Sequence, residues 1–184
     1  MKLAVYGGSF NPPHLGHREA VASVLRELKP DRLLIIPDRI PPHKDMEDGS
    51  PSPEERLRLC HLNFSGFPHT DISDLELKRN GKSFTCDTVA ELEERFPDGR
   101  IFLIIGTDMF LSFEEWYRYE YLLGHCSLAV LARDFDDRDR LDAEAKRFRE
   151  QYGAEVEILS HTPIPMCSQN IREQLRLRKG AEQL

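Results

Sequence analysis

The sequence predicts an α/β fold in which a parallel sheet is covered by helices. Short apolar runs rich in Val, Ile and Leu recur along the chain, and segments between them have the period of an amphipathic helix. This alternation favours a parallel sheet, because each helix carries the chain back to the same end of the sheet. With 184 residues, 40% of them hydrophobic, the chain is expected to form one domain over residues 1–184.

Five apolar runs are predicted to be buried strands, and three segments between them are predicted to be helices. The strands are Lys2–Tyr6, Arg32–Ile36, Ile101–Ile105, Ser127–Leu131 and Ala154–Ser160. The helices are Leu15–Leu28, Pro53 to about Phe64, and Asp87–Phe96. Ser52 fits the N-cap of the second helix, with Pro53 at its first position. Asp38–Pro51 is rich in Pro, Gly and charge, which predicts a long loop of the kind that often carries function.

The composition argues against several classes of protein. A formal net charge of -7 gives no sign of a basic surface for nucleic acid. The four cysteines form no CxxC pair, which argues against a disulfide framework or a zinc site. The N-terminal apolar run is too short for a signal peptide, and no segment approaches the roughly 18 apolar residues of a membrane span. We therefore expect a soluble, cytoplasmic protein with no nucleic-acid or membrane partner and no metal ligated by the chain.

The stretch GGSFNPPHLGH, residues 7–17, lies where the first strand should end and the first helix begin. Ligands of open α/β sheets bind at this edge. Gly7 and Gly8 are expected to let the backbone turn tightly, and free N–H groups at the helix start would seat a phosphate. His14 and His17 are expected on one side of the first helical turn, with Gly16 keeping that side open. Each feature alone also fits an ordinary surface loop.

Two common phosphate-binding motifs are absent from the sequence. There is no GxxxxGK[ST] loop, and GGSFNP does not fit GxGxxG, so neither a P-loop enzyme nor a Rossmann dehydrogenase is indicated. Residues 14–17, His-Leu-Gly-His, instead resemble the (H/T)xGH motif of the nucleotidylyltransferase superfamily. That resemblance implies a Rossmann-like, doubly wound parallel sheet with helices on both faces.

A second element of that superfamily, close to ISSTxIR, is resembled by MCSQNIR at residues 166–172. Ser168, Ile171 and Arg172 match it, whereas the residues at 166, 167 and 169 depart from it. Ser168 can still serve as the N-cap of the last helix, but a hydroxyl contact at position 169 is lost. By resemblance, the planar guanidinium of Arg172 binds the terminal phosphates of ATP. From the pattern alone, Arg172 is equally well a solvated residue on a basic helix.

Three further stretches resemble bacterial nicotinate-nucleotide adenylyltransferases, in that family's order, and the similarity runs from residue 2 to about residue 175. They are IPPHK at 40–44, LKRNGKSFTCDTV at 77–89 and IGTDMFLSFEEW at 105–116. Lys44, on a loop restricted by prolines, would bring a positive charge onto phosphate, although alone it reads as an exposed lysine. Phe84 and Thr85 would seat the nicotinate carboxylate at a helix start near Asp87, a segment that otherwise reads as a helix cap. The family usually has Tyr where this chain has Phe84, so a phenol contact is lost.

Three more residues take roles from the resemblance. Asp108 follows the strand Ile101–Ile105 and would accept hydrogen bonds from ribose hydroxyls or neighbouring substrate groups. Trp116 reads as a core residue from its pattern, whereas the resemblance implies a face on which the pyridine ring stacks. Arg133 follows the next strand and would contact the nucleotide.

The resemblance thus implies transfer of AMP from ATP to nicotinate mononucleotide, with Mg²⁺ arriving on the ATP. The catalytic residues implied are His14, His17, Lys44 and Arg172. The implied ATP-binding residues are Gly7, Gly8, Ser9, Phe10, His14, Gly16, His17, Gly106, Ser168, Ile171 and Arg172. The implied acceptor-binding residues are Lys44, Phe84, Thr85, Asp108, Trp116 and Arg133.

Two alternatives stay open at this point. One is a related adenylyltransferase that uses nicotinamide mononucleotide or phosphopantetheine. The other is a nucleotide-binding regulatory module without catalysis, suggested by the altered MCSQNIR and by a chain that ends earlier than the family commonly does. A homo-oligomer is compatible with either.

Overall fold

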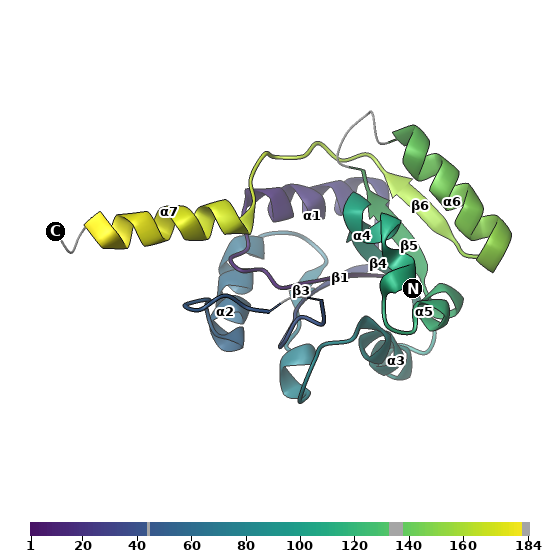
Figure 1. Ribbon diagram of the computed structural model, residues 1–184. Helices are drawn as coiled ribbons and strands as arrows, with labels where there is room; N and C mark the ends of the chain where they lie inside the picture. Colours follow the sequence, from purple (N-terminus) through teal and green to yellow (C-terminus); the bar gives the residue numbers. More distant parts are fainter. Residues whose placement is uncertain (44, 133–137, 182–184) are drawn as a thin grey trace.

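Six parallel strands form one sheet within the residues that the computed structural model describes, which are 1–43, 45–132 and 138–181 (Figure 1). The order across the sheet is β3–β2–β1–β4–β5–β6, and every neighbouring pair is parallel. The strands are β1 Lys2–Gly8, β2 Arg32–Pro37, β3 Thr70–Ile72, β4 Arg100–Gly106, β5 Ser127–Leu131 and β6 Val156–Leu159. This is the strand order of a doubly wound fold, and the predicted fold class is confirmed.

Helices cover both faces of the sheet, and each face has its own apolar core. Helices α1 (Leu15–Glu27) and α2 (Pro53–Phe64) pack on one face. On the other face lie α3 (Thr85–Arg95), α4 (Thr107–Leu111), α5 (Tyr119–His125) and α6 (Arg138–Tyr152), with the short 3-10 helix η2 (Phe113–Glu115). A second 3-10 helix, η1 (Glu76–Lys78), precedes α3. The strands read as continuous apolar runs because both of their faces are buried.

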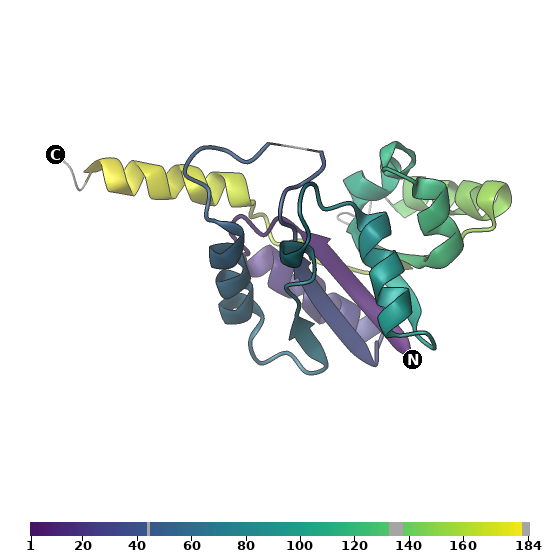
Figure 2. The same cartoon turned by 90° about the horizontal axis from the view of Figure 1, so that it is seen from below.

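The last helix, α7 (Ser168–Ala181), extends away from the body of the molecule, as both ribbon views show (Figures 1 and 2). Only its first turns lie near the sheet. Within the described part of the chain, no helix is both long enough and apolar enough to cross a membrane.

The strand order reverses between β1 and β4, which pair side by side while their following helices go to opposite faces. In open α/β sheets, ligands bind in the crevice at such a reversal, beyond the carboxyl ends of the strands. Gly8 ends β1 and Gly106 ends β4 at this point. The fold therefore brings the predicted phosphate-binding stretch to the edge where a ligand is expected.

The five predicted strands and three predicted helices are present, with small shifts at their ends. Helix α2 begins as expected: Ser52 Oγ accepts from the Glu55 N–H at 3.2 Å, and the Glu55 carboxylate accepts from the Ser52 N–H at 2.7 Å. Helix α3 begins at Thr85, two residues before the expected Asp87. Strand β3 and helices α4 to α6 were not predicted.

Candidate active site

A cavity of about 790 Å³ opens beside the carboxyl ends of β1 and β4. Its wall combines the start of α1 with the end of β4 and the segment that leads into α7. Among the residues that line it are His14, Gly16, His17, Gly106 and Ser168. Five of the predicted nucleotide-binding residues, far apart in sequence, therefore face one space.

His14 and His17 lie against each other at the entrance to α1, with ring centroids 3.8 Å apart. His14 is the N-cap of the helix, in extended backbone, and lies just before the first turn on which it was expected. Its Nδ1 accepts from the Gly16 N–H at 3.1 Å, while Nδ1 of His17 accepts from the N–H of His14 at 3.1 Å. The two rings thus complete a reciprocal capping box, which fixes their orientation.

These backbone bonds also set the tautomer of both rings. In a neutral imidazole one nitrogen accepts and the other carries the proton. Because Nδ1 accepts in His14 and in His17, we assign the proton to Nε2 in each. Burial lowers the pKa of His14, so this ring stays neutral near pH 7. The pair can therefore offer N–H donors to an anion without itself being charged.

Gly16 is needed for the packing of this pair. A Cβ at position 16 would lie 3.0 Å from Cε1 and 3.0 Å from Nδ1 of the His14 ring. Any other residue would push the imidazole aside and stretch the hydrogen bond that orients it. The lack of a side chain at Gly16 thus makes room for the His14 ring, in addition to leaving the cavity open.

The expected tight turn at Gly7 and Gly8 is wrong, because both residues continue β1 and neither has a positive φ. The chain turns at Phe10, whose φ is 44°, and the Asn11–Pro12 peptide that follows is cis. The Phe10 side chain is buried and packs edge-on against His17, with ring centroids 5.2 Å apart. The turn is therefore stabilised by burial of the Phe10 ring. The position of glycines in the sequence does not predict a turn of this kind.

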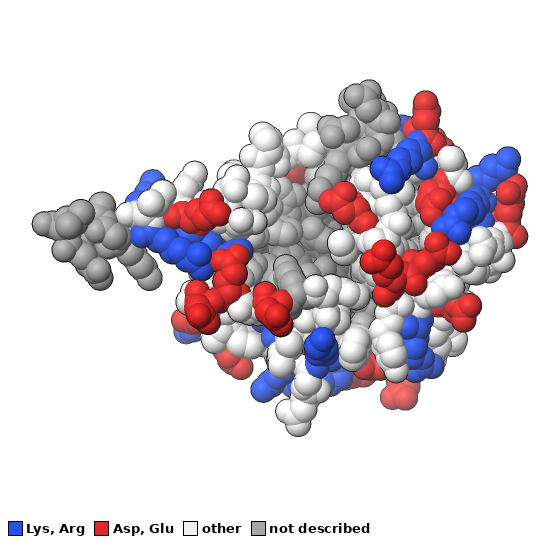
Figure 3. Space-filling model, viewed as in Figure 1, with Lys and Arg blue, Asp and Glu red and all other residues white. Residues whose placement is uncertain are grey.

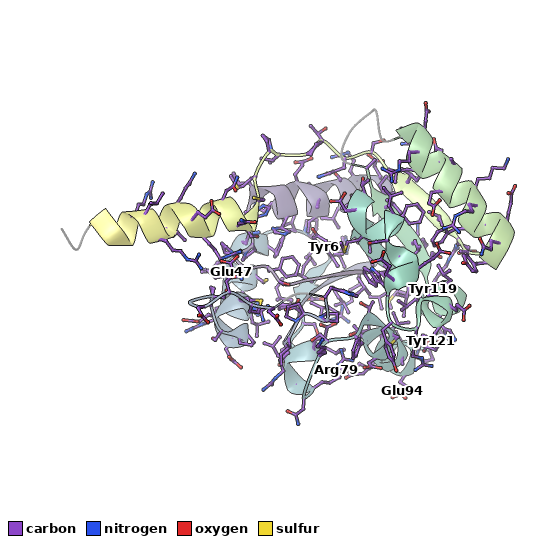
Figure 4. All side chains as sticks on the ribbon, in the orientation of Figure 1. Tyr6, Glu47, Arg79, Glu94, Tyr119 and Tyr121 are labelled. Atoms are coloured by element: carbon purple, nitrogen blue, oxygen red, sulfur yellow. The ribbon has the colours of Figure 1, made fainter. Side chains whose placement is uncertain are left out.

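Arg172 is the fifth residue of α7 and does not border the cavity in the described structure. Its Nη1 donates to the Asn11 carbonyl oxygen at 2.7 Å, and its guanidinium pairs with Glu47 of the Asp38–Pro51 loop. Arg176, one turn later, also pairs with Glu47 at 2.9 Å. Hydrogen bonds from Arg172 hold the pKa of Glu47 below its usual value, with Arg176 adding to the effect. Glu47 is labelled at the start of α7 in Figure 4, and Figure 3 shows basic side chains along α7 beside acidic ones.

Ser168 lines the cavity but is not the N-cap of α7. It is the first residue of the helix, and Cys167 precedes it. Its hydroxyl donates to the Pro12 carbonyl oxygen at 2.9 Å, so it ties α7 to the loop before α1.

A second group of predicted residues lies on the α3 and α5 side of the sheet. Helix α3 begins after Phe84 with no side-chain cap among the described residues, so the N–H of Thr85 stands at an uncapped helix start. The Phe84 ring lies 4.6 Å from that of Tyr117. Trp116 is half-buried, packs on Phe113 at 5.0 Å and has His43 beside it at 5.9 Å. Neither Phe84 nor Trp116 borders the cavity in the part of the chain described.

The remaining predicted residues are partly covered by the structure. Asp108 is exposed in the first turn of α4, directly after β4. Ser9 directly follows β1, and Ile171 lies in the first turn of α7. Lys44 and Arg133 lie outside the described residues. Among the described residues no group of three His, Cys, Asp or Glu side chains could hold a metal ion.

Sequence reasoning missed several residues near these sites. Glu47, which pairs with Arg172, gave no signal in a loop with many charges. Tyr117 is the next residue after the predicted Trp116, and the sequence offered no separate reason to assign it a role. Arg56 did carry a signal, because its spacing of four from Cys60 places it on the buried face of α2. A charged residue at a buried helical position points to a specific role.

Comparison with known proteins places this architecture among nucleotide-transferring enzymes. A family model described as cytidylyltransferase-like matches residues 5–175. A curated protein of Fusobacterium nucleatum is 39% identical over 145 residues, which cover 78% of this chain and 74% of that protein. One of Geobacter sulfurreducens is 34% identical over an aligned stretch of 198 positions, covering 100% and 91%. Both carry the name "Probable nicotinate-nucleotide adenylyltransferase".

A solved structure gives the same picture of the fold. The nicotinic acid mononucleotide adenylyltransferase of Plasmodium falciparum, complexed with NaAD, superposes with a TM-score of 0.75 at 16% identity. The match covers 94% of this chain and 82% of that one.

Proposed function

The chain belongs to the cytidylyltransferase-like family and, within it, to the nicotinate-nucleotide adenylyltransferases; on that premise we propose that it transfers AMP from ATP to nicotinate mononucleotide. The products are nicotinate adenine dinucleotide and pyrophosphate. The observation that carries the proposal is the pair of neutral imidazoles, His14 and His17, oriented by backbone bonds beside a cavity at the reversal of the sheet.

The reaction needs two anions to meet in line. An oxygen of the 5′-phosphate of nicotinate mononucleotide attacks the α-phosphorus of ATP, and the bond from that phosphorus to the oxygen bridging the β-phosphorus breaks. Pyrophosphate leaves with the electron pair of the broken bond. No side chain forms a covalent bond, so the protein acts by holding the two phosphates together and by stabilising the charge that moves onto the leaving group.

In the proposed scheme the ATP lies over the end of β1 and the start of α1. The Nε2–H groups of His14 and His17 donate to the phosphate oxygens, where preorganised donors matter most as charge develops. The backbone of Gly7–Phe10, together with Gly106 and Ser168, lies against the nucleotide, with Ile171 nearby. Arg172 and Lys44 supply positive charge to the terminal phosphates. Mg²⁺ bound to the ATP phosphates would neutralise further charge, held mostly by phosphate oxygens and water.

The acceptor would occupy the neighbouring site on the α3 side. The uncapped start of α3 at Thr85 supports a seat for the nicotinate carboxylate, because free N–H groups and the helix dipole favour an anion there. The half-buried ring of Trp116 would take the pyridine ring on its face. Asp108 would accept hydrogen bonds from ribose hydroxyls, and Arg133 would contact the nucleotide.

A pyrophosphate-release assay with ATP and nicotinate mononucleotide tests this proposal. We expect turnover with this pair and a large loss when the amide, nicotinamide mononucleotide, replaces the acid. The reason is that a site built to bond a carboxylate leaves its N–H donors unpaired when the amide nitrogen faces them. Equal rates with acid and amide would contradict the carboxylate seat, and binding of ATP without turnover of either acceptor would favour a regulatory nucleotide-binding module.

A further inference from the structure

One arginine in the core of the molecule has a role that the reaction scheme leaves unassigned. Arg56 lies on α2, and its side chain is only 1% exposed. It is the largest fully buried side chain in the described structure. A buried guanidinium needs bonds to most of its N–H groups, since an unpaired buried charge strongly destabilises a protein. The hydrogen-bond partners of Arg56 therefore indicate which parts of the structure it holds together.

All four partners of Arg56 are backbone or carboxylate oxygens in two loops. Nη1 donates to the Ser9 carbonyl oxygen at 2.6 Å and to Asp38 Oδ1 at 3.0 Å. Nη2 donates to the carbonyl oxygens of Asp38 at 2.7 Å and Arg39 at 3.1 Å. We name Ser9, Asp38, Arg39 and Arg56 the Arg56 clamp. It joins the loop after β1, where ATP is proposed to bind, to the loop after β2.

Further bonds join the same two loops. The Ser9 hydroxyl donates to the second carboxylate oxygen of Asp38 at 2.7 Å, so both oxygens of that carboxylate are engaged. The N–H of Asp38 donates to the Gly8 carbonyl oxygen at 3.0 Å. The ends of β1 and β2 are thereby locked in one relative position, and the planar fork of Arg56 sets the distance between them.

The clamp continues to the proposed seat of the acceptor. The Arg39 N–H donates to Ser83 Oγ at 2.9 Å, and the Ser83 N–H donates to the Ile40 carbonyl oxygen at 2.9 Å. Ser83 is buried and directly precedes Phe84, the residue before the uncapped first turn of α3. An unbroken series of hydrogen bonds thus runs from Ser9 through Arg56 and Arg39 to the start of α3.

We propose that Arg56 is a positioning residue for adenylyl transfer: the Arg56 clamp sets the separation and orientation of the ATP site relative to the acceptor site. Arg56 touches neither substrate in this scheme. Each site keeps its own contacts without Arg56, but the two phosphates no longer meet in line. Misplacement of reacting groups by about 1 Å can reduce a rate about 100-fold, so the effect falls on kcat rather than on the binding of either substrate. The inference rests on the proposed function for its kinetic part alone.

The test compares three full-length variants with the wild type. Arg56→Met/Asp38→Asn removes the buried guanidinium and neutralises its carboxylate partner, so that no unpaired charge stays in the core. Arg56→Lys keeps the charge but loses the fork that reaches two loops. Arg58→Met, at an exposed position on the same helix, is the matched control.

Two readouts separate positioning from general support of the fold. The first is the Kd of ATP alone and of nicotinate mononucleotide alone by calorimetry, against kcat with both saturating. We expect each Kd to change less than about threefold, and kcat to fall about 30- to 100-fold in both Arg56 variants and not in Arg58→Met. A merely structural role would instead reduce the fraction of protein that binds ligand while leaving kcat per binding site unchanged.

The second readout needs no activity. Hydrogen exchange of the ligand-free protein should be at least about tenfold faster at the amides of Asp38, Arg39 and Ser83 in the Arg56 variants, with α5 unchanged. If kcat stays within about threefold of the wild type in folded Arg56 variants, or if these amides exchange at the wild-type rate, the proposal is overturned. If Arg56→Met/Asp38→Asn does not fold, Ser83→Ala breaks the series at its last side chain and must lower kcat without weakening ATP binding. A wild type with no turnover would overturn the proposed function, and hydrogen exchange would then decide on the clamp.

Discussion

In the proposed reaction site, hydrogen bonds from the backbone orient individual side chains. His14 and His17 each accept a main-chain N–H on Nδ1, which leaves Nε2 as the donor in both rings. Gly16, one of the two residues between them, has no side chain that would disturb this arrangement. The histidines are therefore oriented before any ligand arrives, and no reorganisation is needed at the moment of reaction.

Removal of one imidazole should show its contribution directly. We expect His17→Ala to lower kcat by about 10² to 10³, the loss typical of one preorganised donor in a site shielded from water. His61→Ala, at an exposed position on α2, should leave kcat unchanged. Steady-state kinetics of the two variants with ATP and nicotinate mononucleotide provide the measurement, and a loss of less than about tenfold would remove His17 from its role.

At the scale of elements, the contact between α7 and the Asp38–Pro51 loop stands out. Glu47 of the loop binds both Arg172 and Arg176 of the helix, and the Asn11 side chain donates to Ser50 Oγ at 3.0 Å. The loop is thus attached to the helix and to the strand-to-helix connection at once. In the proposed scheme Arg172 binds phosphate, so the Glu47 carboxylate occupies the position that an anionic ligand would need.

Removing the negative charge of Glu47, which competes with ATP for Arg172 in this scheme, should strengthen ATP binding. With Glu47→Gln, Arg172 has no anionic partner to give up, and we expect the Kd of ATP to fall about two- to fivefold, as for a partly exposed ion pair. Asp45→Asn removes an exposed carboxylate from the same loop and serves as the control. Titration of ATP at low and at high salt would show the difference shrinking as salt screens the pair. A weaker affinity in Glu47→Gln would contradict the competition.

For the molecule as a whole, a buried carboxyl group links stability to pH. Glu76 in η1 is 7% exposed, and burial raises its pKa to about 7. The Asp38 charge adds to this shift, whereas the hydrogen bond from Thr88 and the charge of Arg79 oppose it. The unfolded chain releases this proton near pH 4.5, so between pH 4.5 and 7 the folded state holds more protons than the unfolded state. Stability is then lost as pH rises through this interval.

Replacing Glu76 by glutamine, which has the same shape but no charge, should remove the dependence of stability on pH that this residue causes. We expect Glu76→Gln to match the wild type at about pH 5 and to exceed its unfolding free energy at about pH 8 by on the order of 1–3 kcal/mol. Urea unfolding at both pH values measures this, with Glu94→Gln, at an exposed position on α3, as the control (Figure 4). A difference between Glu76→Gln and wild type that is the same at both pH values would contradict the assignment.

The sequence predicted some strands and helices of this molecule and missed others. All five predicted strands were located, four of them (β1, β2, β4 and β5) by largely buried apolar runs and β6 by a shorter, partly buried segment. Strand β3 has three residues and pairs only with β2 at the sheet edge in the described structure, so it has no apolar run to detect. Helix α6 buries Leu141, Ala145 and Phe148 at helical spacing, a pattern that was present but left unassigned.

The site was harder to predict than the fold, because a motif identifies residues but not the groups with which they form hydrogen bonds. The HxGH stretch identified His14 and His17, but their mutual capping depends on backbone angles that no spacing specifies. The turn assigned to Gly7 and Gly8 is made by Phe10 instead. The Arg56 clamp joins residues up to 47 positions apart, which only the folded chain brings together. The family resemblance implied a doubly wound sheet, but the order of the strands came only from the structure, because an apolar run carries no information about which strands pair with it.

Trp116, the only tryptophan of the chain, gives the molecule a built-in optical reporter. Its indole is half-buried and lies near the rings of Phe113 and His43, and Trp116 belongs to the proposed acceptor site, so we expect its emission to respond to binding there. Quenching of that intrinsic fluorescence would let occupancy of this site be followed in real time, without a label and separately from chemistry at the histidines.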